Sequence, residues 1–180
     1  LGLGNVPGAH RRELRLANEI TRRTTILLTA AYRAGTEFAC ENPADRGDPT
    51  KPWIFHFPEH GPIWRDPGME TLAAACCTEA ATFAMCMFGA ETQKYSTLWF
   101  TSGLSPALRK LNSMLCSHTP GAHESIAGGV QNEDGKWNSA DAAKYPADFN
   151  LFIADAIAAL ATRDEPKPRP SSPQIPPPTT

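Results

Sequence analysis

The chain has 180 residues, of which 41% are hydrophobic and 20% are charged, so it is long enough for one domain with its own core. Its formal net charge is −2, which excludes a strong global attraction to nucleic acid. It contains no run of about 18 apolar residues and no basic and apolar leader, so we expect no membrane association and an intracellular location, nuclear or cytoplasmic.

Residues 11–33 are predicted to form one helix. The apolar residues recur at helical spacing and are expected to face the core: Leu16, Ile20, Thr24, Leu27, Leu28 and Ala31. Gly35 supplies a C-terminal stop. Four arginines lie on the opposite side: Arg11, Arg15, Arg22 and Arg33. They indicate either a solvated helix face, which we favour, or a stripe that contacts phosphates.

In residues 36–41 (TEFACE), Phe38 and Cys40 alternate with smaller or polar neighbours, and Pro43 follows shortly after. This pattern predicts a buried strand. Residues 44–67 are rich in proline and aromatic residues and predict a long loop. Its aromatic residues, Trp53, Phe55, Phe57 and Trp64, are expected to pack on the domain.

The next segments predict a helix, a hairpin and two further helices. A helix is expected over 68–77, strands over 82–88 and 95–101, a helix over 105–115 and a final helix that opens at Pro146. Residues 132–137 are turn material, and the proline-rich residues 163–180 are expected to be a disordered tail. The domain boundaries are therefore 1–162 and 163–180.

The carboxyl end of the first strand carries Glu41. Open α/β sheets gather their ligands at this edge, although most glutamates at strand ends are simply solvated, and position alone favours that interpretation. Five cysteines at scattered positions favour a reducing compartment over a disulfide scaffold. Cys116, His118 and His123 could hold zinc if a fourth ligand such as Cys86 joined them. Their spacing matches no standard zinc module, so we expect hydrogen bonds or phosphate contacts instead.

Five segments of the chain, in this order, resemble segments of one known protein family. They are RLANEITRRTTILLTAAYRAG, ENPADRG, CMFGAETQKYSTLWFTSGL, CSHTPGAHESIAGG and SADAAKYPADFN. Together they resemble the C-terminal portion of DNA cytosine methyltransferase-like domains, which phages and the polyproteins of mobile elements carry. The resemblance covers residues 1–160. It implies an α/β fold: part of a Rossmann-like, class I methyltransferase-like sheet, with a parallel strand that ends at Glu41, an edge β-hairpin of opposite sense and flanking helices.

The resemblance implies catalytic roles for Glu41 and Asn42. In cytosine-5 methyltransferases such a glutamate contacts the Watson–Crick edge of a flipped cytosine and helps to protonate N3 while a cysteine thiolate adds to C6. The resemblance also implies substrate contacts for Pro43, Gln93, Lys94 and Thr97. A hairpin with a solvated lysine is the alternative for Lys94.

Two required parts of such an enzyme are missing from the sequence. It has no Pro-Cys nucleophile loop and no Gly-containing strand-turn-helix for S-adenosylmethionine. Cys40 cannot replace the nucleophile, because alternation along a strand points it away from Glu41. Since the chain begins with Leu1, we expect it to be a piece of a longer reading frame.

The parent domain would use S-adenosylmethionine and DNA, whereas this chain alone should bind no cofactor. Its partner would be the missing N-terminal half of the same domain. The alternatives are a non-catalytic nucleic-acid-binding or structural module and a small zinc-binding fold.

Overall fold

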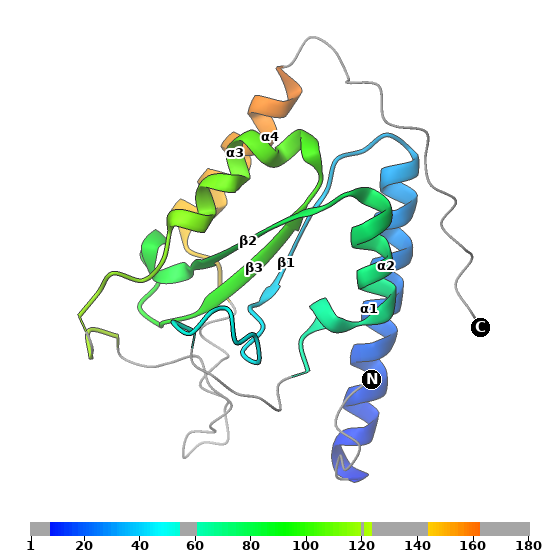
Figure 1. Ribbon diagram of the computed structural model, residues 1–180, viewed down its shortest axis with the longest axis horizontal. Helices are drawn as coiled ribbons and strands as arrows, with labels where there is room; N and C mark the ends of the chain where they lie inside the picture. Colours follow the sequence, from blue (N-terminus) through cyan, green and yellow to red (C-terminus); the bar gives the residue numbers. More distant parts are fainter. Residues whose placement is uncertain (1–7, 55–60, 120, 124–143, 163–180) are drawn as a thin grey trace.

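The fold is a mixed α/β arrangement in which helices lie on both sides of one small sheet. The computed structural model describes residues 8–54, 61–119, 121–123 and 144–162. Figure 1 shows the elements, which are α1 (Arg11–Arg33), β1 (Ala39–Pro43), α2 (Pro67–Cys76), β2 (Glu79–Ala84), β3 (Tyr95–Phe100), α3 (Ser105–Leu108) and α4 (Ala147–Ala161). The expected α/β class is therefore confirmed in its coarse form.

The sheet has the strand order β1-β3-β2, and β3 is antiparallel to both neighbours. The expected hairpin of β2 and β3 is present, but β3 is central among the described strands and the strand that carries Glu41 pairs with it antiparallel. Hydrogen bonds next to the two strands explain this pairing, because Thr101 donates its backbone N–H to the Phe38 carbonyl at 3.1 Å and its hydroxyl accepts from the Phe38 N–H at 3.0 Å. β1 and β2 consequently run in the same direction on either side of β3.

One face of the sheet is covered by α3, α4 and the turn that follows α3. Phe149 of α4 stacks on Phe83 of β2, with ring centroids 5.3 Å apart, and meets Phe88 edge-on at the same distance. The predicted final helix is confirmed and begins directly after Pro146. The apolar spacing of this helix predicts that Phe149 and Ile157 share its buried face, but only Phe149 is buried and Ile157 is 55% exposed.

The other face is covered by α1 and α2. Their side chains form a second buried cluster with residues of the preceding loop and turn: Tyr32, Phe38, Trp64, Met69, Leu72 and Cys76. Asp66 caps α2 by accepting hydrogen bonds from the backbone N–H groups of Gly68 and Met69 at 2.9 and 3.2 Å. The predicted helix over 68–77 is thus confirmed within one residue at each end.

Helix α1 has the predicted bounds but does not bury the predicted face. Leu16, Ile20 and Leu27 are 61%, 56% and 67% exposed, whereas Tyr32 is buried. The two helices differ in length, with 23 residues in α1 and 10 in α2. At about 1.5 Å per residue, α1 extends well beyond the helix that covers it. Figure 1 shows this overhang at the N-terminal end of α1.

Two other predicted elements are shorter than expected. β2 ends at Ala84, and Met85–Phe88 forms a 3-10 turn instead of continuing the strand. The turn ends at Gly89, whose φ of 85° favours glycine. The helix predicted over 105–115 is α3 followed by a 3-10 turn at Arg109–Ser113.

The aromatic loop packs on the domain through one of its tryptophans. The Trp64 indole N–H donates to the Pro43 carbonyl at 3.0 Å, and its ring lies 4.8 Å from that of Trp99. Trp53 is 45% exposed. Phe55, Phe57, the turn expected at 132–137 and the expected disordered tail lie outside the described residues.

Candidate functional site

The structure brings Glu41 and Lys94 together at one end of the sheet. Glu41 lies opposite Leu98 in the ladder between β1 and β3, and Lys94 immediately precedes β3. The distance from Lys94 Nζ to Glu41 Oε1 is 3.7 Å, and the two side chains are only 16% and 12% exposed. This is a largely buried ion pair, so the carboxylate is shielded from solvent on the side that faces Lys94.

Tyr145 completes this cluster, and the sequence analysis did not single it out. Its hydroxyl donates a hydrogen bond to Glu41 Oε2, and Lys94 Nζ lies 5.5 Å from the centre of its ring. Burial and then the hydrogen bond to Glu41 raise the pKa of Tyr145 above that of an ordinary tyrosine. The only sequence signal was its place directly before Pro146, within a segment that carried the family resemblance.

One oxygen of Glu41 is left without a hydrogen bond. Oε1 is buried and has no hydrogen-bond partner among the described residues, since Lys94 at 3.7 Å is too far away to donate one. A buried acceptor of this kind is destabilising unless a donor reaches it. Glu41 Oε1 can therefore accept a hydrogen bond from a ligand, provided that the side chains that bury it move aside.

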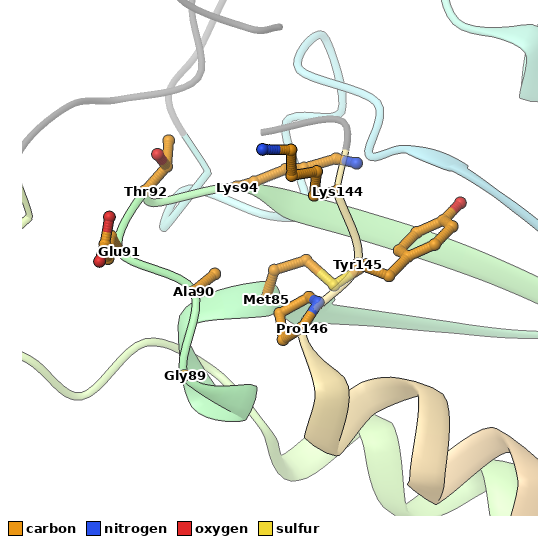
Figure 2. Close-up of a pocket in the computed structure, with 9 residues that line it drawn as sticks. All are labelled: Met85, Gly89, Ala90, Glu91, Thr92, Lys94, Lys144, Tyr145 and Pro146. Carbon is orange, nitrogen blue, oxygen red and sulfur yellow. The ribbon is translucent and has the colours of Figure 1, made fainter. Parts of the chain in front are cut away.

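A pocket of about 220 Å³ lies beside the cluster. Figure 2 shows the turn at 89–92 on one side of it and residues 144–146 on the other, with Met85 between them. Lys94, Lys144 and Tyr145 all line this pocket. Two lysines beside an aromatic ring provide positive charge and a stacking surface, which suits a planar or anionic ligand.

Two of the remaining predicted site residues, Asn42 and Thr97, lie on the opposite face of the sheet from Glu41. Thr97 projects from the opposite face of the sheet, and its hydroxyl is 2.9 Å from that of Thr82 in a buried hydrogen bond. Asn42 is paired with Thr97 in the ladder and shares that face. Pro43 ends β1 and offers its carbonyl to Trp64, and Gln93 is half-buried next to Lys94.

Cys40 packs with the cluster between the sheet and α1 and α2, on the face opposite Glu41. Burial, together with the negative charge of Glu41, raises the pKa of the Cys40 thiol. A buried thiol with a raised pKa is a poor nucleophile. Cys40 and Glu41 therefore lie on opposite faces of the sheet, as the alternation along the strand predicted.

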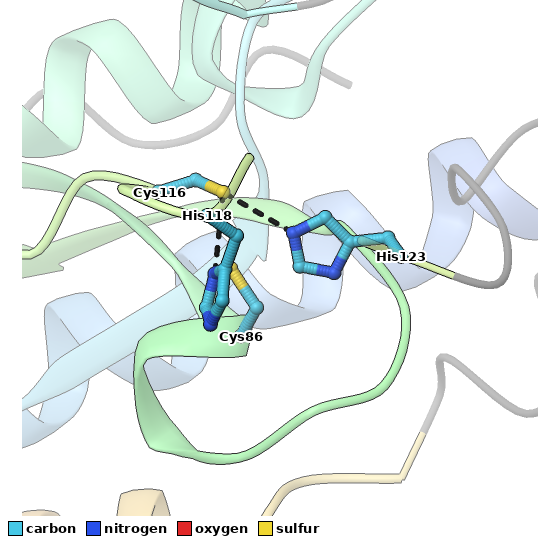
Figure 3. A group of neighbouring side chains, drawn as sticks. All are labelled: Cys86, Cys116, His118 and His123. Carbon is cyan, nitrogen blue, oxygen red and sulfur yellow. Dashed lines mark hydrogen bonds between the residues drawn. The ribbon is translucent and has the colours of Figure 1, made fainter. Parts of the chain in front are cut away.

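A second group of side chains gathers behind the pocket. Cys86 belongs to the 3-10 turn after β2, and Cys116, His118 and His123 belong to the segment after Ser113. Their four candidate ligand atoms all lie within 4.8 Å of one another. Figure 3 shows the Cys116 sulfur facing both imidazole rings, with Sγ 3.2 Å from His123 Nε2 and 3.6 Å from His118 Nδ1.

The two thiols of this group differ in their environments. Burial and then the neighbouring Cys116 raise the pKa of the Cys86 thiol to about 12. Burial also acts to raise the pKa of Cys116, but the hydrogen bonds with His123 and His118 outweigh it and lower that pKa to about 6. Cys116 is therefore the thiol that ionises more easily.

One arginine of the stripe predicted on α1, Arg22, is held in an ion pair. Glu19 binds both Arg22, at 2.8 Å, and Arg23, at 2.7 Å. Hydrogen bonds from these two arginines lower the pKa of Glu19 to about 2. Arg22 is therefore ion-paired on an exposed helix face, and the choice between a solvated face and a phosphate-binding stripe stays a prediction for the other three arginines.

Comparisons with protein-family models, with curated proteins and with solved structures gave no match to this chain. Among the described residues, none of the helices combines the length and the apolar character needed to cross a membrane.

Proposed function

We propose that this chain is part of a DNA (cytosine-5) methyltransferase-like domain of a mobile element or phage, and that Glu41 recognises the target base. In this proposal Glu41 accepts a hydrogen bond from the Watson–Crick edge of a cytosine flipped out of the duplex. The nucleophile and the site for S-adenosylmethionine belong to another portion of the same domain. Such a domain acts inside the cell, in the nucleus or the cytoplasm.

The observation that carries the proposal is the unsatisfied oxygen of Glu41. Protonation of cytosine N3 needs a carboxyl group held close to the base and away from bulk water. Glu41 Oε1 is buried, has no hydrogen-bond partner among the described residues and is next to the cationic Lys94. Tyr145 covers the other oxygen and would have to move, or share the carboxylate, when a base binds.

Two surfaces of the fold, one edge of the sheet and one face of α1, support the proposal that another portion of the domain packs against this chain. β1 has β3 on one side and no other strand beside it among the described residues. Leu16, Ile20 and Leu27 of α1 are exposed apolar side chains on one helix face. A Rossmann-like sheet would continue at the free edge of β1, and its next helix would cover α1. The partner in this proposal is therefore the N-terminal half of the same domain.

The decisive test is to join the chain to that N-terminal half and to measure the rate of DNA methylation. The reading frame upstream of Leu1 should encode a Pro-Cys loop and a Gly-containing cofactor loop. Glu41→Gln should then lower the methylation rate by about 100-fold or more, the range of a lost general acid, while DNA affinity changes little. Glutamine can still hydrogen-bond the base but cannot deliver a proton to N3. Equal rates for Glu41→Gln and the parent would make Glu41 a structural residue.

Lys94→Ala is the matched comparison for that experiment. It should weaken DNA binding and flatten the salt dependence of binding, because one positive charge near the substrate is lost. A change in the chemical step without any change in affinity would contradict this role for Lys94.

The second candidate function is a nucleic-acid-binding module that performs no chemistry. Lys94 and Lys144 on the border of one pocket favour it, because both can contact phosphates. DNA binding by the 180-residue chain, together with an upstream sequence that encodes neither catalytic loop, would make this the better description.

A further inference from the structure

We propose that Cys86, Cys116, His118 and His123 bind one zinc ion. The tertiary structure joins a cysteine of the turn after β2 to three side chains of a segment 30 residues later, and no recognised sequence spacing connects them. Two thiolates and two imidazoles are the donor set of a closed structural zinc site. The inference does not depend on the proposed methyltransferase function.

The distances within the cluster fit a tetrahedral ion. With Zn–S near 2.3 Å and Zn–N near 2.05 Å, tetrahedral geometry places a sulfur roughly 3.6 Å from a nitrogen. Cys116 Sγ is 3.6 Å from His118 Nδ1 and 3.2 Å from His123 Nε2. All four ligand atoms lie within 4.8 Å of one another, so small side-chain rotations bring them to a common centre.

The hydrogen bonding of His123 prepares it to bind a metal. Its Nδ1 lies 3.2 Å from the backbone carbonyl oxygen of Glu91. A carbonyl only accepts, so this contact requires the proton on Nδ1 and leaves a lone pair on Nε2 in the neutral ring. Nε2 points at Cys116 (Figure 3). Metal-bound histidines in proteins usually make the same second hydrogen bond to a carbonyl or carboxylate.

The backbone holds the two ligand segments in place. Ala84 donates its N–H to the Met114 carbonyl at 2.8 Å, which fixes the segment before Cys116 beside the end of β2. Met85 donates to the Lys94 carbonyl at 2.8 Å and closes the turn that carries Cys86. These two hydrogen bonds anchor the turn that carries Cys86 and the segment before Cys116 to the sheet.

The ion would fix the wall of the pocket. The 3-10 turn that carries Cys86 leads directly into Gly89, Ala90 and Glu91, which line the pocket beside Lys94. Zinc would link this turn to the segment at 116–123 and restrict its motion. Zinc binds both cysteines as thiolates and the histidines as neutral rings, so binding releases to solvent whatever protons the two thiols still hold.

A disulfide between Cys86 and Cys116 is the main alternative, because their sulfurs are close and both cysteines are free in the structure. The two states differ in thiol count and metal content. Zinc leaves both cysteines reduced once the metal is removed by a chelator, whereas a disulfide leaves neither.

The test is the metal content and cobalt spectrum of the purified 180-residue chain. We expect one equivalent of zinc per chain. After chelation and cobalt addition, a thiolate-to-cobalt charge-transfer band and the intense visible bands of a tetrahedral ion should appear. Cys116→Ser and His123→Ala should weaken zinc binding by more than the roughly 10- to 100-fold that the loss of an outer hydrogen-bond partner causes.

Cys77→Ser is the matched control, because Cys77 is an exposed free cysteine at the end of α2 and outside the cluster. It should keep full zinc content and the cobalt bands. A chelator should lower the melting temperature of the wild type and of Cys77→Ser. If Cys116→Ser fails to fold, the cobalt spectrum of the wild type still shows whether cysteine thiolates bind the metal. Cobalt bands without thiolate charge transfer, a Cys86–Cys116 disulfide, or equal zinc loss in Cys77→Ser would overturn the proposal.

Discussion

Replacement of Phe149 by alanine should destabilise the domain by about 4 kcal/mol, within the range of roughly 3–5 kcal/mol for buried Phe→Ala changes. Phe149 is only 4% exposed, and its ring contacts those of Phe83, Phe88 and Tyr145 at centroid distances of 5.3, 5.3 and 5.5 Å. The change would leave a cavity between α4 and the sheet and remove three aromatic contacts, each worth about 0.5–1.5 kcal/mol beyond burial.

Urea unfolding followed by circular dichroism measures this loss. With a slope of about 2 kcal/mol per molar urea, the midpoint should fall by roughly 2 M. Leu151→Ala on the same helix is the control, because Leu151 is 62% exposed and its loss should change stability by no more than about 0.5 kcal/mol. Similar midpoints for the two variants would refute the packing of α4 on this face of the sheet.

Three further predictions follow from particular contacts. Asp66→Ala should lower the free energy of unfolding by about 1 kcal/mol in the same urea assay, because two N–H groups of α2 lose their cap. Asp66→Asn should keep most of the wild-type stability, because asparagine can also cap a helix. The 180-residue chain should give no heat of binding with S-adenosylmethionine in calorimetry, and micromolar affinity would contradict the domain boundary that we infer. The raised pKa of Tyr145 favours its neutral form, so the stability that this contributes is complete below about pH 10 and is lost as the pH rises through the folded-state pKa. An ultraviolet difference titration against Tyr145→Phe should show this step above pH 10, and a step at or below that value would contradict the buried contact with Glu41.

The sequence alone determined the elements whose signals are local. The bounds of α1 followed from helical periodicity and Gly35, and α4 followed from Pro146 and its apolar spacing. The strand over 95–100 followed from β-branched and aromatic residues. Each of these signals acts between residues that are close in the chain, so no tertiary information was needed to find them.

Only the tertiary structure decided which faces are buried and which strands pair. Leu16, Ile20 and Leu27 have the pattern of a buried stripe, yet α2 packs on the side of α1 that carries Thr25, Leu28 and Tyr32. The α1 sequence does not specify which side its partner helix takes. The apolar run at 82–88 is divided between β2 and a 3-10 turn, because burial all round is equally compatible with either conformation.

In the candidate site, too, some features followed from the sequence and others only from the tertiary structure. Glu41 and Lys94 were candidates from their places in the predicted strand and hairpin and from the resemblance. The contact of Tyr145 with Glu41 spans 104 residues and depends on how α4 docks on the sheet. Cys116, His118 and His123 were visible as neighbours in sequence, and Cys86 was a candidate fourth ligand, but only the fold of β2 and its turn brings Cys86 beside them. Sequence specifies which chemical groups are present, and long-range packing decides which of them meet, because contacts between distant segments leave no periodic signal in the chain.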